Sequence, residues 1–284
     1  MPLSTINSNS FSTTANTNID NGLLFLDVTN NRVGVRQTSP QHSLDITTGE
    51  VGLKITGSSS GYAQGGILIN SATTESPQTR GLGVFLYNEG SDVNWYSGTF
   101  YTDADSWGVS RKTGSSFDSS VADTPNRFLK IDSSGRITLP NQPAFSAALT
   151  RSSSSTWNNM SNQTIIFDDA STGQLFNRGS HYNTSTGRFT APVAGVYVFS
   201  FSSNITGGGS FKNVQLRVNG NNVREGYNQS DTSWDLMSWT HIVELNQNDY
   251  VNAHYIPESG TATLDANVSG SSVQWTFFNG CLLG

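Results

Sequence analysis

Four things are scarce in this sequence, and each scarcity narrows its class. One cysteine, Cys281, among 284 residues allows no intrachain disulfide. Only 15 Lys and Arg residues stand against 21 Asp and Glu, a net charge of −6, so no basic stripe could neutralise nucleic-acid phosphates. No apolar run reaches membrane-spanning length. Runs of strong helix formers are also rare, which argues against a helical bundle. We therefore expect neither a nucleic-acid partner nor membrane insertion.

The first residues have neither the basic start nor the apolar core of a secretory signal. This predicts synthesis in a cytoplasm, with any extracellular role reached through release inside a particle. Cys281 itself lies in the apolar run 275–283, which indicates a buried small side chain rather than a reactive thiol.

Glycine and aromatic residues are plentiful. The chain has 28 Gly, and 11% of its residues are aromatic. Disordered segments are poor in aromatics, so the composition indicates a folded protein with many turns. The predicted fold class is all-β.

A hairpin pattern occurs twice. In residues 23–35, two short β-prone runs flank an Asn-rich turn, and Asn tolerates the left-handed conformation of a tight hairpin. Residues 128–139 repeat the layout, and Pro40 and Pro140 follow the two copies. Because a lone hairpin is only marginally stable in water, neighbouring copies of the chain are expected to stabilise both.

Three domains are predicted from these patterns: an N-terminal arm and β-hairpin stem over 1–49, a small central β domain over 50–140, and a jelly roll over 141–284. Short apolar runs separated by turn residues predict that the central domain is a small β-sandwich or meander. These runs are 65–69, 81–87, 93–96 and 107–110. About eight strands over 141–284 fit one jelly roll.

Residues 141–284 resemble the globular domain of complement C1q, of the tumour-necrosis-factor-like jelly-roll superfamily. Segments 143–147, 186–201 and 277–283 carry the resemblance, and Phe189, Gly195, Tyr197, Phe199 and Phe201 stand at the family's spacing. The resemblance implies a ten-strand-type jelly roll that assembles as a homotrimer, with aromatic strand faces buried about a three-fold axis.

The alternating strand 196–201 sends Tyr197, Phe199 and Phe201 to one face, which is too large an apolar face to leave in water. We predict that these three residues, with Phe189 and Phe277, form the trimer and core packing. The expectation is that a single copy of the chain could not bury them.

Residues 31–46 are similar to a short motif common in bacteriophage tail-fibre and related virion proteins, and the sequence of residues 128–140 also resembles phage-fibre sequences. This resemblance implies that the protein belongs to a virion and that its N-terminal region binds other virion proteins.

No motif for catalysis or metal binding is present: there is no His-Glu-x-x-His, no phosphate-binding loop and no paired Cys-x-x-Cys. Carboxylates in polar loops commonly serve turns. The close carboxylate pairs are Asp103/Asp105, Asp168/Asp169 and Asp231/Asp235. We expect no enzyme activity, metal or cofactor, with a calcium site built from loop Asp and carbonyl oxygens as a weak alternative.

One loop has the composition of a recognition site. Tyr227 and Trp234 offer aromatic faces, and Asn228, Gln229 and Asp231 offer planar hydrogen-bonding groups, the combination that binds sugars. The alternative is that Trp234 covers one end of the barrel or packs at a subunit boundary.

The function expected from these observations is a homotrimeric, non-enzymatic virion fibre or spike whose jelly roll binds a host-surface receptor, with a glycan expected rather than a protein. A capsid-decorating or tail-adaptor fibre without receptor binding is the main alternative. A bacterial adhesin, disfavoured by the missing signal, and a polysaccharide-cleaving spike are the others.

Overall fold

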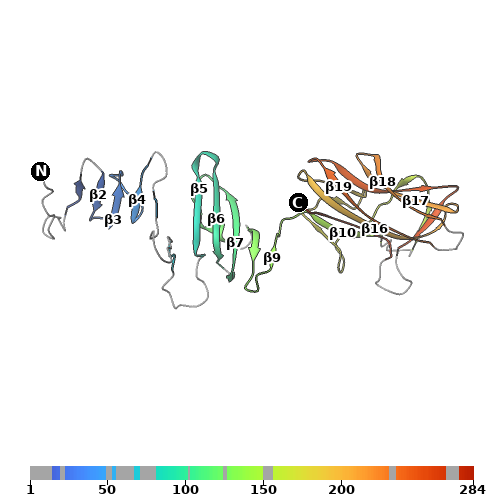
Figure 1. The fold of residues 1–284 in the computed structure, drawn as a ribbon, viewed down its shortest axis with the longest axis horizontal. Helices are drawn as coiled ribbons and strands as arrows, with labels where there is room; N and C mark the ends of the chain where they lie inside the picture. The colour runs from blue at the N-terminus through green and yellow to red at the C-terminus, as the bar shows by residue number, and fades with distance from the viewer. Residues whose placement is uncertain are drawn as a thin grey trace, which may run out of the picture. The chain divides into compact units, whose positions relative to one another are not determined.

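The computed structural model describes residues 15–19, 23–48, 53–55, 67–70, 81–101, 103–123, 127–149, 156–229, 235–266 and 275–284. The chain divides into two compact units, Met1–Asn70 and Ser71–Gly284. Its secondary structure is almost entirely strand, as predicted (Figure 1). No helix among the described residues is long and apolar enough to cross a membrane.

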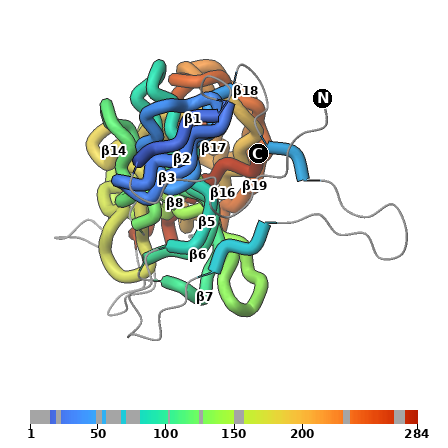
Figure 2. The backbone as a smooth tube through the Cα atoms, turned by 90° about the vertical axis from the view of Figure 1, so that its left-hand side faces the viewer, coloured from blue at the N-terminus to red at the C-terminus, as the bar shows by residue number. Residues whose placement is uncertain are grey.

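The first unit contains a four-stranded sheet, here called the stem sheet. Its strands lie side by side in chain order (Figure 2). They are β1 (Thr17–Ile19), β2 (Leu24–Asp27), β3 (Arg32–Val35) and β4 (Leu44–Ile46). β2 and β3 form the predicted antiparallel hairpin, and β4 joins β3 in parallel.

Local hydrogen bonds explain the turn of this hairpin. Asn31 adopts a φ of 55°, and the Asp27 carboxylate accepts bonds from the Asn30 amide at 3.1 Å and side chain at 2.8 Å. The Asn30 side chain holds the pKa of Asp27 below its usual range. Apart from this turn the sheet has little interior: no aliphatic or aromatic side chain of its four strands is fully buried.

The second unit begins with an antiparallel meander, here called the central sheet. Its strands are β5 (Gly83–Asn88), β6 (Val93–Phe100), β7 (Asp103–Thr113), β8 (Arg127–Ile131) and β9 (Ile137–Thr138). β8 and β9 are the predicted second hairpin. The alternative of a sandwich is wrong for the described residues, because these five strands form a single sheet.

Segment 115–123 covers one face of the central sheet and includes the short 3-10 helix η2 (Ser119–Ala122). Tyr96 and Phe100 from β6 pack there with Val121 and Ala122, and the Phe85 ring lies 4.7 Å from that of Tyr96. The expected strand 65–69 is not observed. Its described part, residues 67–69, is exposed and has no regular structure, while residues 65 and 66 lie outside the described residues.

Residues 144–282 form the predicted jelly roll, in which two antiparallel sheets enclose one core. Sheet I contains β10 (Ala144–Ala148), β11 (Thr156–Met160), β13 (Phe176–Arg178), β16 (Gly195–Gly207), β19 (Asp235–Leu245), β21 (Ala262–Asp265) and β22 (Phe277–Leu282). Sheet II contains β12 (Gln163–Thr164), β14 (Tyr182–Asn183), β15 (Arg188–Thr190), β17 (Phe211–Val218), β18 (Asn221–Gln229) and β20 (Tyr250–Pro257).

The core of the jelly roll is aromatic and is complete within one chain. The Phe145 ring stacks on Phe189 at 5.2 Å, and Phe199 stacks on Phe278 at 5.7 Å. Gly280 is needed beside them, because a Cβ there would lie 2.5 Å from the Phe199 ring and 2.7 Å from that of Phe145.

This core corrects one prediction. The predicted packing residues Phe189, Tyr197, Phe199 and Phe201 are all buried between the two sheets of a single chain. The alternation along β16 was predicted correctly, but no partner copy is required to bury these rings. Phe277 differs: it is only half-buried, and its neighbour Phe278 enters the core instead.

Candidate functional site

The predicted recognition residue Tyr227 lies on the outer face of sheet II, where 64% of it is exposed. Its hydroxyl donates a 2.7 Å hydrogen bond to Oε1 of Glu225, two residues away on the same face of β18. This contact fixes the ring edge beside a carboxylate. Because the hydroxyl donates to the ionised form, it holds the pKa of Glu225 below its usual range and raises the pKa of Tyr227.

Side-chain amides surround the same carboxylate. Gln215 Nε2 donates to Oε2 of Glu225 at 3.1 Å, and Asn222 Nδ2 donates at 2.9 Å. The strand register causes this meeting, since Gln215 lies opposite Glu225 and Asn213 lies opposite Tyr227 in the β17–β18 pair. A bulge between Leu216 and Arg217 sets that register, shifting the two strands by one residue.

The polar surface continues across β17 and β20. Arg217 Nε donates to Oε1 of Gln215 at 2.9 Å, which orients that amide from its second side. His254 lies opposite Gln215 in the β17–β20 pair, with Nε2 2.7 Å from Asn162 Oδ1. Burial, with the charge of Arg217, lowers the pKa of His254 to about 4, so its imidazole is neutral at pH 7.

We call this surface the amide face. It consists of Asn213, Gln215, Arg217, Asn222, Glu225, Tyr227 and His254. Its groups are planar and most are already tied to one another, so they are held in fixed orientations. Planar amide, carboxylate and guanidinium groups beside an aromatic ring can bind vicinal hydroxyls while the ring covers an apolar patch of the ligand.

The amide face does not have the arrangement of a hydrolase site. A glycosidase needs two carboxylates across a cleft, and Glu225 is the one carboxylate of this face. The predicted Asp pairs serve structure where they are described. Asp169 Oδ1 accepts the backbone amides of Ser171 at 2.9 Å and Thr172 at 3.1 Å, and Asp235 forms a 2.8 Å ion pair with Lys212.

In the part of the chain that the structure describes, no group of three His, Cys, Asp or Glu side chains could hold a metal ion. The calcium site stays a prediction, since Asp231 lies outside the described residues.

The predicted recognition loop is brought together only in part. Gln229 lies opposite Phe211 and is exposed on the same side as Tyr227. Asn228 points elsewhere, because its side chain donates to the Leu236 carbonyl at 3.1 Å and ties β18 to β19. Asp231 and Trp234 lie outside the described residues.

The sequence analysis missed most of the amide face. Three strands contribute it, and β17 and β18 pair across a bulge. A regular register counted from the turn 219–220 would place Gln215 opposite Arg224 instead of Glu225. The available signal was the run of polar residues at alternate positions, Asn213, Gln215 and Arg217, in a strand whose other positions are apolar or buried.

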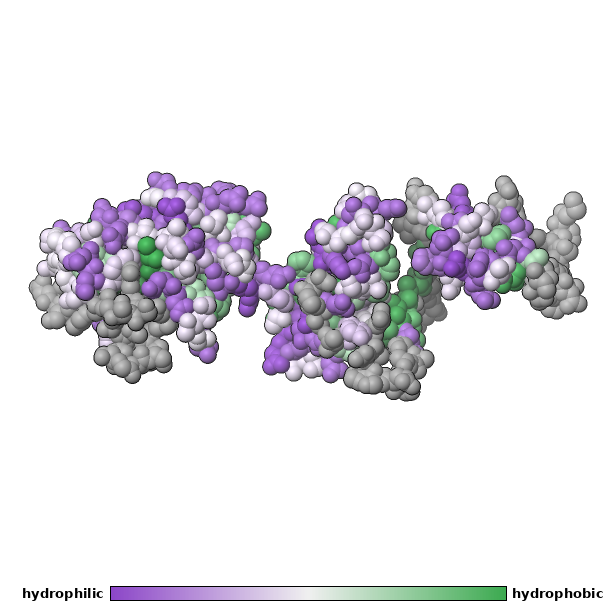
Figure 3. Space-filling model, turned by 180° about the vertical axis from the view of Figure 1, so that it is seen from behind, coloured by the Kyte–Doolittle hydropathy of each residue, from purple (hydrophilic) through white to green (hydrophobic). Residues whose placement is uncertain are grey.

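The outer face of sheet I is the opposite in character. Val196, Leu236 and Ile242 are exposed there, and Ile242 lies opposite Val198 in the strand register. Phe277 reaches this face and lines a hollow of about 390 Å³ with Trp275 and Leu236. A second hollow of about 270 Å³ lies farther along the face, beside Val198, Phe176 and Cys281. Much of the jelly-roll surface visible in Figure 3 is hydrophilic.

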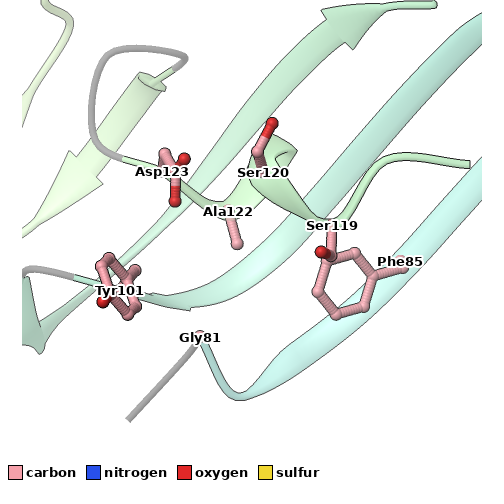
Figure 4. Close-up of a pocket in the computed structure, with 7 residues that line it drawn as sticks. All are labelled: Gly81, Phe85, Tyr101, Ser119, Ser120, Ala122 and Asp123. Carbon is pink, nitrogen blue, oxygen red and sulfur yellow. The ribbon is translucent and has the colours of Figure 1, made fainter. Parts of the chain in front are cut away.

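A third hollow, of about 310 Å³, lies in the central domain (Figure 4). The rings of Phe85 and Tyr101 stand at opposite ends, and Ser119 and Ser120 of η2 also line the hollow. Lys112 Nζ already donates to the Ser120 hydroxyl at 2.6 Å, and Asp123 is the one carboxylate among the lining residues. The described lining of this hollow therefore offers fewer polar side chains than the amide face.

Residues 144–283 match the sequence model of the C1q domain. The C-terminal region thus matches a C1q domain, as its sequence predicted. No curated protein sequence matches the chain.

Three solved structures also resemble the chain, and each match covers 50% of its length. The globular domain of a zebrafish complement 1qA protein is 21% identical, with 98% of that chain covered and a TM-score of 0.38. The Eiger TNF from S. frugiperda is 9% identical, with 94% covered and a TM-score of 0.40. Murine APRIL is 8% identical, with 99% covered and a TM-score of 0.37.

Proposed function

Starting from the C1q/TNF-like domain of residues 144–283, we propose that three copies of this chain form a fibre or spike of a bacteriophage virion. The jelly roll is its receptor-binding head, and the ligand is a glycan on the host surface. The N-terminal region attaches the fibre to other virion proteins. On this proposal the protein is made in the host cytoplasm and carried on the particle.

Two apolar surfaces support the trimer. The outer face of sheet I leaves Leu236 and Ile242 65% and 58% exposed, beside the half-buried Phe277. The stem sheet has no fully buried aliphatic or aromatic side chain among its described residues, so it has little of its own to hold it together. Association of identical copies with closed symmetry would remove both surfaces from water.

The amide face carries the assignment of the ligand. It lies on sheet II, so an assembly through sheet I leaves it accessible in every copy. Its fixed amides, the Glu225 carboxylate and the Tyr227 ring supply the hydrogen bonds and the apolar contact that a sugar needs. Three heads on one trimer, and several trimers on one particle, would turn weak single sites into firm attachment.

The N-terminal sequence supports the virion assignment. The sequences of the two hairpins resemble those of phage fibres, and both hairpins have the antiparallel pairing that their turn residues predicted. A stem built from small sheets, rather than from collagen or a coiled coil, suits an elongated particle appendage.

The test is an array of bacterial surface polysaccharides probed with the labelled full-length protein. We expect saturable binding to a subset of polysaccharides, weakened about tenfold by Tyr227→Ala, which corresponds to about 1.4 kcal/mol. Tyr227→Phe, which keeps the ring, should lose less. The matched control is Thr186→Ala, an exposed turn residue of the same jelly roll.

Equal binding by Tyr227→Ala and Thr186→Ala would remove the amide face from the proposal. A chain that sediments as a trimer but binds neither the array nor host cells would instead be a capsid-decorating or tail-adaptor fibre without receptor binding.

A further inference from the structure

Among the residues that the structure describes, none forms a covering layer over one whole face of the central sheet. Segment 115–123 lies on the Tyr96 and Phe100 side. On the other side, Leu86 lies opposite Trp95, and these two side chains are 62% and 40% exposed. A two-layer domain needs a second apolar layer on each hydrophobic face, so this face requires a partner.

Apolar residues extend over all five strands of that face. Trp107 of β7 lies opposite Ile131 of β8, and Ile131 lies opposite Ile137 of β9. Phe128 reaches the same side, with its ring 6.2 Å from that of Trp95. We call this surface the aromatic face; its exposed members are Val84, Leu86, Trp95, Trp107, Phe128 and Ile137. An exposed apolar patch that spans five strands is rare on a monomer.

The charges of the domain do not oppose packing on this face. Arg111 lies on it, with its guanidinium 5.9 Å from the centre of the Trp95 ring. The ion pairs of Asp103 with Arg127 and Lys130, and of Lys112 with Asp118, are formed within the domain. A nearly uncharged aromatic surface suits an identical surface better than it suits a charged ligand.

The connection to the head identifies the partner. β9 ends at Thr138 and β10 begins at Ala144, so five residues join the central sheet to the jelly roll. Five extended residues span at most about 18 Å. Three heads joined in one trimer would therefore hold three central sheets close together, at an effective concentration that favours contact.

We propose that the aromatic faces of three central sheets pack against one another and form a second trimer contact below the head. This inference rests on the proposed trimer. It adds that the middle of the chain is itself an assembly element, and that the Trp95 and Trp107 surfaces are buried by second and third copies of the chain.

Site-directed cross-linking tests this in the full chain. Cys281 is the one cysteine, so Cys281→Ser gives a cysteine-free background. Leu86→Cys in that background places a thiol on the aromatic face. Ser116→Cys, exposed on the covering segment of the same domain, is the matched control. With a short bis-maleimide we expect covalent dimers and trimers on a denaturing gel from Leu86→Cys, and single chains from Ser116→Cys.

Sedimentation of the same proteins separates the possible failures. A trimer whose Leu86→Cys thiols react with a single maleimide but do not cross-link would overturn this inference and leave the proposed function standing. If the thiols of the trimer are unreactive and unlinked, the maleimide is applied again to chains dissociated into single folded copies. Thiols that stay unreactive there would show that another part of the same chain covers the face, which also overturns the inference, whereas thiols that become reactive would support it. A single folded chain in solution would remove the proposed trimer itself.

A second variant guards against misfolding at position 86. Trp107→Asp should raise deuterium exchange in β6 and β7 while the head keeps its trimer. Unchanged exchange in these strands would also contradict the proposal.

Discussion

The head and the two sheets before it bury their apolar residues in different ways. The head closes an aromatic core between sheets I and II within one chain, whereas the stem sheet has no buried apolar side chain among its described residues and the central sheet covers one face of two. The difference indicates that the head can fold as a single copy. On the proposed trimer, the sheets before it would gain stability from neighbouring copies, whereas the head would not need them to fold.

Truncation of a core ring should give the largest effect. Phe199→Ala removes a fully buried ring and should lower the free energy of unfolding of the head by about 3 to 5 kcal/mol. Phe25→Ala in the half-buried stem sheet should cost a single chain less than about 1 kcal/mol and act mainly by weakening assembly. Hydrogen exchange, resolved by region, measures the stability of the head and of the stem sheet separately. Equal losses of stability from the two variants in single chains would contradict the difference between head and stem.

The buried ion pair of the head should give the next effect. Lys212 and Asp235 are each 3% exposed and lie 2.8 Å apart. Asp235→Ala leaves a buried cation and should destabilise the head by about 3 kcal/mol, at the lower end of such effects because Lys212 keeps its 2.8 Å bond to the Gly209 carbonyl. The double variant Lys212→Met, Asp235→Leu should recover most of that loss in denaturant unfolding. No recovery would mean that the charges themselves are needed.

Mild acid should loosen the head before the central sheet. The pKa of His254 is about 4 in the fold against 6.5 for a free imidazole, so the unfolded chain binds more protons between these values. The head should therefore lose about 2 kcal/mol as the pH falls from 6.5 to 4. His254→Gln should reduce the change in the free energy of unfolding with pH, measured by urea unfolding at pH 7, 5 and 4. If the variant shows the same change with pH as the unaltered chain, another group causes it.

Stronger acid should destabilise the central sheet, and this is the smallest of the expected changes in stability. Hydrogen bonds from Lys130 and Arg127 lower the pKa of Asp103 to about 2. The ionised Asp103 therefore contributes fully to the free energy of unfolding above about pH 3.8, and this contribution is lost as the pH falls through 2. Asp103→Asn should cost about 1 kcal/mol at pH 7 and remove the acid sensitivity of β7 between pH 4 and 2. Persisting sensitivity in exchange measurements would contradict this assignment.

Local turn chemistry made both hairpins predictable. Asn30 and Asn31 between β-prone runs specify a tight turn, and Asn31 has the left-handed φ expected of it. Alternation along β16 was predictable too. What covers the aromatic side of β16 was not predicted correctly, because alternation separates two faces without showing whether the same chain or a partner copy covers either one.

Other features depend on contacts that alternation does not encode. The apolar run ending at Ile69 resembles a strand by composition but has no pairing strand where it is described. The amide face depends on one bulge at Val223 in β18, which shifts every pair beyond it from the turn by one residue. The sequence therefore located Tyr227, while its partner Glu225 was found only in the folded sheet.

The five-residue connection between the central sheet and the head also has a mechanical consequence. Asn141 donates to the Arg127 carbonyl at 3.3 Å, and Gln142 donates to the Leu282 carbonyl, so the connection is fastened on both sides. Arg127 begins β8, and Leu282 ends β22 beside β10. A pulling force on the head would therefore act first on these two hydrogen bonds at the connection. It would not begin by extending a flexible linker.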